Sequence, residues 1–490
     1  MSRQGQIGRR ALLGAAAALG AASLATSAAP ARAAARRSVA DRPAAQLPAR
    51  PELLIRGAYV LTMDPALGDL PRGDVHVRDG DIVAVGTDLA APGAIVLDAR
   101  DTIAMPGFVD THWHLWTTSL RALVRNDAAA EYGYFPLTDR VGVSYTPEDA
   151  YRAVRLGLAE ALYSGITTVH DWAHNILSPA HADADLRALA DVGIRARFSY
   201  GYSRTLQVEP ERPMDVGDLA RVQRDWLARP NDGLITLGMA SRSFTPDAIT
   251  QRSGSTALRA LHQDWDGTRA LGLPITLHVG PPGVVTLLEQ EGMLGPDVQL
   301  VHPTMTTAAE REILAGRGST FSSSPITETR RLQERGDIQL AELLDAGVQT
   351  SLSVDHIVGL NCDFFTAMRV LHWNHSHRVG DRVPLPTRRI VELATIDGAR
   401  DLGIADRVGS LTPGKRADLI LVRTADANVA PLGEPTHALV FAVQPRNVDT
   451  VLVDGRILVQ GGQLTALDEE QAVREAAESA AALHARTGWP

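Results

Sequence analysis

Between about residues 108 and 402, short apolar runs alternate with longer segments whose apolar positions follow a helical pattern. The helical segments include residues 147–163, 258–271 and 306–315. Eight apolar runs can be counted, at 108–115, 165–172, 194–201, 234–240, 274–280, 298–305, 319–325 and 349–356. Repeated strand–helix units indicate a parallel sheet, and eight of them in about 300 residues predict an α/β fold of the TIM-barrel type.

A different pattern flanks this middle segment. From about residue 52 to 103, short β-branched runs are separated by turn signals, among them Asp79-Gly80. Similar runs return at 417–422 and 450–459, where Asp454-Gly455 supplies a second tight turn. Asp-Gly between apolar runs is typical of a β-hairpin, so both ends of the chain are expected to build one small β-sandwich domain. The predicted boundaries are 51–106 and 405–465 for this domain, 107–404 for the barrel and 466–490 for a C-terminal helix.

The overall composition is that of an ordinary globular protein. The 490 residues are 45% apolar and 21% charged, with a formal net charge of -9. No Lys/Arg-rich block occurs outside the N-terminus, which argues against nucleic acid or anionic lipid as a partner. We therefore expect a small-molecule substrate.

The N-terminus has the features of an export signal. Arg9-Arg10 precede an Ala/Leu/Gly-rich run and a small-residue cleavage site at residues 31–33. This order is typical of a twin-arginine signal peptide at 1–33, followed by a flexible linker at 34–50. It predicts secretion, without stable membrane insertion after cleavage; a retained anchor or lipid attachment is the alternative. The single Cys362 can form no intramolecular disulfide.

Polar residues lie where the predicted barrel strands end. The first strand ends in Asp110-Thr111-His112-Trp113-His114, and the strand period of two puts His112 and His114 on one face. His278, His302 and Asp355 end the fifth, sixth and eighth strands. The carboxyl ends of barrel strands meet at one mouth. Imidazoles and a carboxylate gathered there suit zinc or a similar divalent ion, with an open position for water.

Three segments resemble the amidohydrolase superfamily, in particular its triazine hydrolases and its S-adenosylhomocysteine or cytosine deaminases. They are residues 106–114 (PGFVDTHWH), 394–400 (ATIDGAR) and 409–419 (GSLTPGKRADL), and the similarity spans about 52–464. The resemblance implies that the metal ligands are His112, His114, His278 and Asp355. It also implies that His302 contacts substrate or water.

The resemblance also bears on the number of metal ions. Two-metal members of this superfamily bridge their ions with a carboxylated Lys or a Glu on the fourth strand, and here residues 234–240 read LITLGMA. One divalent ion is therefore expected, most simply Zn²⁺, with Fe²⁺ or Mn²⁺ as alternatives. The ion would lower the pKa of its bound water to about 7, and Asp355 would accept the proton.

One position departs from the deaminase pattern. Deaminases of this superfamily carry a Glu three residues after the strand-five His, and here that position is Pro281. The general acid must then be another residue: His302, Glu328 on the loop after strand seven, or His170 or His174 at the end of strand two.

Other residues near the predicted mouth have two interpretations. Trp113 and Trp116, together with His170 and His174, could line the substrate pocket or serve packing alone. His372, His375 and His377 fall in a helical stretch, where exposed or capping histidines are a plainer explanation than a second metal site.

The sequence thus predicts a secreted metal-dependent amidohydrolase that uses metal-bound hydroxide. Its target is a C–N bond, as in an amide, amidine or deamination substrate, or a C–Cl type bond of a cyclic or heteroaromatic small molecule. One alternative keeps the barrel and metal but performs non-hydrolytic chemistry, such as decarboxylation, a lyase reaction or cyclisation. Another is a non-catalytic secreted metal-binding scaffold. Members of the superfamily often associate, so a homo-oligomer is expected.

Overall fold

The computed structural model divides the chain into two compact units, residues 1–37 and 38–490. It describes residues 45–121, 123–124, 133–203, 209, 211–227, 233–243, 255–279, 282–302, 304–330, 336–380 and 383–489. The predicted signal peptide, most of the predicted linker and Pro281 lie outside these residues.

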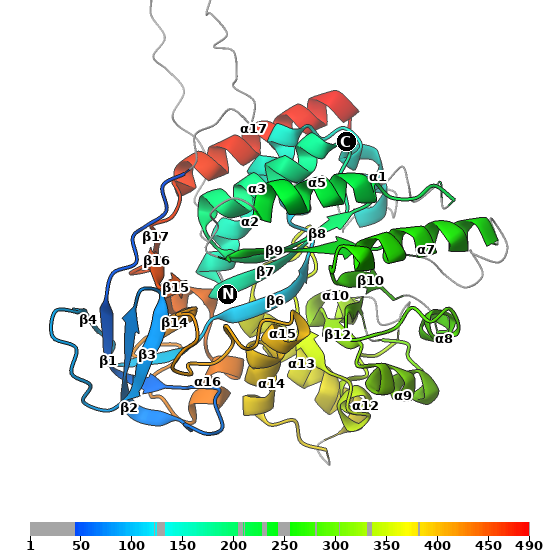
Figure 1. Ribbon diagram of the computed structural model, residues 1–490. Coiled ribbons are helices and arrows are strands. Elements are labelled where there is room, and N and C mark those ends of the chain that lie inside the picture. Colours follow the sequence, from blue (N-terminus) through cyan, green and yellow to red (C-terminus); the bar gives the residue numbers. More distant parts are fainter. Residues whose placement is uncertain are drawn as a thin grey trace, which may run out of the picture. The chain divides into compact units, whose positions relative to one another are not determined.

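Eight parallel strands form the barrel in their order along the chain (Figure 1). They are β6 (Phe108–Trp113), β7 (Ile166–Ala173), β8 (Arg195–Gly201), β9 (Ile235–Ala240), β10 (Ile275–His278), β11 (Val298–Val301), β12 (Thr320–Ser323) and β13 (Thr350–Leu352). A parallel bridge between Trp113 and Asp355 joins the first strand to the segment after the last, so the barrel is nearly closed. Each strand lies inside its predicted run, except that β7 extends one residue beyond its run, which confirms the predicted fold.

The helices between these strands begin at recognisable caps. The helix α2 (Pro147–Tyr163) has a capping box between Thr146 and Asp149, and α9 (Ala308–Arg317) has one between Thr307 and Glu310. In each box the Thr side chain and the acidic side chain satisfy backbone N–H groups that the helix leaves open. The other barrel helices are α1 (Tyr134–Gly142), α3 (Pro179–Val192), α5 (Val216–Leu227), α7 (Ser255–Ala270), α8 (Val284–Gln290), α10 (Pro325–Arg330), α12 (Leu340–Asp345), α13 (Phe364–Val379), α14 (Thr387–Leu393) and α15 (Ile396–Asp401), with the 3-10 helix η2 (Leu115–Leu120).

Both ends of the chain contribute to a second sheet of nine strands. They are β1 (Leu53–Val60), β2 (Leu70–Arg78), β3 (Asp81–Gly86), β4 (Ile95–Asp98), β5 (Thr102–Pro106), β14 (Leu419–Arg423), β15 (Val448–Val453), β16 (Arg456–Gln460) and β17 (Gln463–Leu464). The two ends meet where β5 pairs antiparallel with β14. The composite β domain is confirmed, and the strand β5, which the sequence pattern did not separate, joins its two parts.

Backbone conformation explains the two predicted hairpin turns. Asp79 and Gly80 have φ of 55° and 86°, and Asp454 and Gly455 have 55° and 74°. A two-residue hairpin turn with positive φ at both positions favours Asp-Gly. The side chain of Arg416 links the two turns, because it bonds the carboxylates of both Asp81 and Asp454.

The predicted C-terminal helix is α17 (Glu469–Thr487), which Asp468 caps. It packs along α2 (Figure 1), where Arg155 Nη1 lies 2.9 Å from Glu475 Oε2. The sheet domain also includes the short helices α16 (Pro435–Phe441) and η5 (Pro445–Asn447). Among the described helices, none combines the length and the apolar character needed to cross a membrane.

Candidate metal centre

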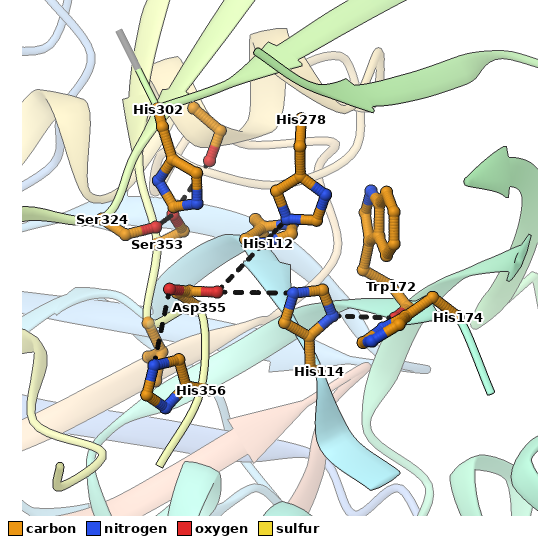
Figure 2. Close-up of polar contacts among 12 residues, drawn as sticks. His112, His114, Trp172, His174, His278, His302, Ser324, Ser353, Asp355 and His356 are labelled. Carbon is orange, nitrogen blue, oxygen red and sulfur yellow. Dashed lines mark hydrogen bonds and ion pairs between the residues drawn. The ribbon is translucent and has the colours of Figure 1, made fainter. Parts of the chain in front are cut away.

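Four predicted ligands come together at the carboxyl ends of the barrel strands (Figure 2). They are His112 of β6, His114 just after β6, His278 at the end of β10, and Asp355 just after β13. One donor atom from each lies within 4.8 Å of the other three. The Nε2 atoms of His112 and His278 are 3.1 Å apart, and Asp355 Oδ1 is 3.3 Å from His112 Nε2 and 3.4 Å from His114 Nε2.

Backbone geometry fixes the position of Asp355. Its N–H donates to the carbonyl of His112 at 2.8 Å, and its carbonyl accepts from His114 N–H at 2.7 Å. Its φ is +70°, and His302 at the end of β11 has φ +72°. Side chains other than glycine rarely adopt this conformation, and the strain persists where surrounding contacts enforce it. Among the described barrel residues, these are the two non-glycine residues in this conformation; one is a predicted ligand and the other lies beside the ligands.

Burial sets the protonation of the cluster. It lowers the pKa of His112, and it holds the pKa values of His114 and His278 well below the usual range. Burial alone would raise the pKa of Asp355, but the neighbouring His356 and the hydrogen bond from His112 outweigh it and hold that pKa well below its usual range. At neutral pH the cluster therefore offers three neutral imidazoles and one carboxylate.

This donor set fits a divalent metal ion. Nδ1 of His114 donates to the carbonyl of Trp172 at 3.1 Å, which leaves the lone pair of Nε2 facing the other donors. Neutral imidazole nitrogens and a carboxylate oxygen are the donors that zinc and similar ions take in catalytic sites. Among the described residues this is the one group of His, Cys, Asp or Glu with such geometry.

The residues His302 and Glu328 form a buried pair beside the cluster. The ring of His302 stacks on that of His278, with centroids 5.4 Å apart. Its Nδ1 lies 3.2 Å from Glu328 Oε1, which also accepts from Ser324 N–H at 2.8 Å, while Glu328 Oε2 accepts from Ser323 Oγ at 2.7 Å. Glu328 therefore contacts His302 rather than lying free in the site.

The two predicted histidines near the end of the second barrel strand, His170 in β7 and His174 just after it, have different environments. Both nitrogens of His170 are bonded inside the barrel, Nδ1 to the carbonyl of Thr111 at 2.8 Å and Nε2 to Ser199 Oγ at 2.7 Å. The ring of His174 lies against His114 with centroids 4.3 Å apart, and burial lowers its pKa to about 4. The structure thus brings His174 to the edge of the cluster and leaves His170 no free nitrogen.

The predicted aromatic residues are fully buried. Trp113 belongs to the hydrophobic core, and Trp116 packs against Tyr145 and donates Nε1–H to His174 Nδ1 at 3.3 Å. On α13, His375 Nε2 bonds the carbonyl of Val383 and His372 packs on Phe441, so these histidines do not converge on a common point.

Two residues beside the cluster were missed in the sequence. Trp172 lies between the predicted His170 and His174, and its ring is 4.2 Å from that of His278 and 5.1 Å from that of His114. The sequence signal that could have identified Trp172 is its spacing of two residues from both His170 and His174 at the end of the second strand. His356, next to Asp355 in the chain, has Nε2 3.9 Å from Asp355 Oδ2 and stacks on Tyr134.

A nearly closed parallel barrel that gathers three neutral imidazoles and a carboxylate at its carboxyl end is the architecture of metal-dependent barrel hydrolases. Residues 103–458 match the model of the amidohydrolase family. The chain belongs to this family, as its sequence motifs predicted.

Known relatives and structures agree with this assignment. The chain is 29% identical over 446 residues to the 5'-deoxyadenosine deaminase of Methanosarcina mazei, covering 89% of this chain and 99% of that one. A zinc-bound adenosine deaminase from Xanthomonas campestris has the same fold, with a TM-score of 0.74, 23% identity and coverage of 89% and 100%. A zinc complex of atrazine chlorohydrolase from Arthrobacter aurescens also has this fold, with a TM-score of 0.73 and 22% identity. The match covers 87% of this chain and 100% of that one. The predicted enzyme class, hydrolases acting on carbon–nitrogen bonds other than peptide bonds, is confirmed at this level.

Proposed function

We propose that this protein is a zinc-type, single-metal hydrolase that removes an amino substituent from a purine-like heterocyclic small molecule. The observation that carries the proposal is the cluster of His112, His114, His278 and Asp355, whose donor atoms lie within 4.8 Å of one another. The deaminase named among the relatives acts on an adenine-type compound, which suggests the substrate class. A divalent ion held here supplies Lewis-acid activation of water at neutral pH.

The chain's own residues supply the proton transfers. Asp355 is ionised and touches the same cluster, so its carboxylate is the group placed to accept a proton from the attacking water. Trp172 covers one side of the rings of His278 and His114. Burial of the donors keeps them unprotonated and ready to bind the ion.

The leaving-group step is assigned to His302. Its Nδ1–H is donated to Glu328, so Nε2 is the nitrogen left for a departing amino group. Glu328 is a positioning residue in this scheme, because it acts through His302. In this scheme the His302–Glu328 pair supplies the proton that the Glu of the deaminases would supply and that the side chain of Pro281 cannot.

A second substrate class follows from the same position. Chloride leaves as an anion and needs no proton, whereas an amino group must be protonated to leave. A chain with Pro281 at the sequence position where the deaminases carry a Glu is therefore also suited to C–Cl bonds, the type of bond named for the chlorohydrolase of the same fold. The non-hydrolytic alternative and the non-catalytic scaffold are separate outcomes of the test below.

The test is metal analysis of the purified protein together with an activity screen. Wild type should hold about one divalent ion per chain and act on one of a set of amino-, chloro- or amide-bearing heterocycles, with oxygen-18 from solvent water entering the product. His112→Ala should lose the ion and the activity, whereas His181→Ala, a buried histidine bonded to Ser178 and the carbonyl of Tyr145, should keep both. A metal-free wild type, or full activity in His112→Ala, would overturn the proposal. Product without solvent oxygen would indicate non-hydrolytic chemistry, and bound metal without activity a scaffold.

The twin-arginine motif supports a further proposal, export of the enzyme. Replacing Arg9 and Arg10 together by Lys should retain the protein in the cytoplasm of its host, while the unchanged chain is recovered outside it. Equal distribution of the two forms in fractionated cells would contradict the export proposal.

A further inference from the structure

The seam between β6 and β13 closes the barrel in a different way from its other strand pairs. Every other pair of neighbouring barrel strands is joined by a parallel backbone ladder. At the seam, the described residues form a single backbone bridge, between Trp113 and Asp355. The predicted ligands His112 and His114 lie on one side of this seam and Asp355 on the other. The geometry of the metal-ligand cluster therefore depends on what holds the two sides together.

The side chain of Asp110 on β6 supplies a further bond across the seam. Its Oδ1 accepts from Val354 N–H at 2.9 Å, where a ladder would supply a backbone carbonyl. Asp110 is fully buried, and Val354 directly precedes Asp355 in the chain. A buried N–H without an acceptor is destabilising. Asp110 therefore holds the residue next to a predicted ligand against the first strand.

The hydroxyl of Thr111 makes other contacts across the seam. Its Oγ1 donates to the carbonyl of Leu352 at 2.9 Å and lies 2.8 Å from both Ser351 Oγ on β13 and Ser322 Oγ on β12. A hydroxyl can donate one hydrogen bond and accept two, so the donation to Leu352 leaves Oγ1 able to accept from the serines. Thr111 directly precedes His112, so these contacts hold the other side of the cluster.

The backbone carbonyl of Thr111 is bonded to two further strands. It accepts from Gln299 Nε2 of β11 at 3.1 Å, and His170 Nδ1 of β7 lies 2.8 Å from it. Four strands besides β6 thus contact this one residue. Barrel interiors are ordinarily filled by Val, Ile and Leu, and valine has the shape of threonine without the hydroxyl. Packing alone would therefore not require a hydroxyl at this position.

We infer that Asp110 and Thr111 are positioning residues that set the separation between Asp355 and the histidines at the end of the first strand, and with it the affinity of the site for its divalent ion. Asp355 Oδ1 lies 3.3 Å from His112 Nε2 and 3.4 Å from His114 Nε2, and the three side chains point toward one another (Figure 2). Removing residues that orient metal ligands without binding the ion typically costs about 10- to 100-fold in metal affinity. The inference rests on the proposed metal-dependent function and deepens it.

The experiment measures zinc affinity of the full-length protein by chelator competition, together with Tm. Thr111→Val removes the hydroxyl and keeps the shape, so it should weaken zinc binding about tenfold, whereas Thr111→Ser should stay within about threefold of wild type. Asp110→Asn keeps an oxygen for Val354 N–H and should bind zinc more tightly than Asp110→Leu, which offers none. Thr268→Val is the matched control. Its buried hydroxyl donates to the carbonyl of Asp264 at 2.7 Å on α7, so its loss should lower Tm and leave zinc affinity unchanged.

A measurement on the wild type does not depend on the folding of any variant. The amide of Val354 should exchange slowly with solvent deuterium when zinc is bound. It should remain slow after a chelator has removed the zinc, because its acceptor is Asp110 and not a metal ligand. Mass spectrometry of peptides that cover residues 350–356, with fragmentation to single residues, gives this rate.

The outcomes distinguish this inference from the proposed function. Equal zinc affinities in Thr111→Val, Thr111→Ser and wild type, with Tm lowered as in Thr268→Val, would overturn the inference and leave the hydroxyl a structural role alone. Rapid exchange of the Val354 amide in zinc-free wild type would also overturn it, while the proposed function would stand. A wild type that binds no zinc would overturn both.

Discussion

Glu328→Gln separates the charge of Glu328 from its geometry. The carboxylate accepts from His302 Nδ1 and Ser324 N–H through Oε1, and from Ser323 Oγ through Oε2. A glutamine with its oxygen at the Oε1 position keeps the first two bonds. Its NH₂ then faces Ser323 Oγ, a hydroxyl that can turn and accept. The substitution should therefore preserve the position of His302 and remove only the negative charge beside it.

The size of the effect follows from hydrogen-bond energies. Bonds to charged groups contribute about 1.5–3 kcal/mol and neutral ones about 0.5–1.5, so the protonated form of His302 loses about 1–2 kcal/mol. Each 1.36 kcal/mol is a factor of ten in rate. We expect kcat of Glu328→Gln to fall about five- to thirtyfold, with KM within about twofold of wild type. Glu328→Ala also releases the ring of His302, and its kcat should fall by a factor of about 100 or more.

Steady-state kinetics on the substrate found in the screen give kcat and KM, and metal analysis should show an unchanged zinc content because Glu328 is not a ligand. Glu310→Gln is the matched control: Glu310 is equally buried and accepts from Gly283 and Thr307 N–H at 2.9 and 3.0 Å, away from the cluster. It should lower Tm and leave kcat unchanged. If both Glu328 variants keep wild-type kcat while losing stability as Glu310→Gln does, Glu328 has a structural role alone and the assignment to His302 fails.

Three further changes test the surroundings of the site. Asp355→Asn keeps the side-chain shape but removes the anionic donor, so zinc per chain measured by mass spectrometry should fall well below one; a full complement would show that Asp355 is no ligand. Trp172→Leu should weaken zinc binding about tenfold in chelator competition. Trp265→Leu, which alters a buried tryptophan bonded to Ser241, should leave zinc binding unchanged. Equal zinc affinities of Trp172→Leu and wild type would show that Trp172 does not contribute to the metal site. Burial raises the pKa of Asp171 to about 8. Between about pH 4 and 8 the folded protein therefore holds a proton on Asp171 that the unfolded chain has lost. The free energy of unfolding falls as pH rises through that window, by up to about 1.4 kcal/mol per pH unit. Asp171→Asn should flatten this slope in urea titrations at about pH 5, 6.5 and 8, and an unchanged slope would contradict the assignment.

Sequence periodicity was sufficient for the barrel because each strand is buried on both faces. Such strands stand out as short apolar runs, and caps such as Thr307 with Glu310 mark where a helix begins. The strand β5 was not separated from its neighbours. Its residues 102–106 (TIAMP) become a strand by pairing with β14, more than three hundred residues away. The run at 417–422 could be predicted from its own local pattern, whereas the partner that makes residues 102–106 a strand is distant in the sequence.

The ligand set was predictable for a related reason, since strand ends in a parallel barrel converge whatever the loops do. The roles of the neighbouring histidines were not, because a role depends on which nitrogen remains free. His170 is bonded by Thr111 and Ser199, which come from two different strands. The availability of its nitrogens therefore becomes defined only when three strands are assembled.

The same reasoning bears on the proline that replaces the expected glutamate. Three residues after His278, Pro281 removes a carboxyl group from the site, whereas Glu328 comes from α10, after the seventh strand, and places one against His302. The second carboxylate is buried, accepts three hydrogen bonds and contacts a histidine whose ring stacks on a metal ligand. If the two arrangements are equivalent, restoring an acid with Pro281→Glu should reduce the dependence of kcat on Glu328. In that case the loss in the double variant Pro281→Glu/Glu328→Gln would be smaller than in Glu328→Gln alone. Equal losses in the two backgrounds would mean that the His302–Glu328 pair does not perform the missing acid's task.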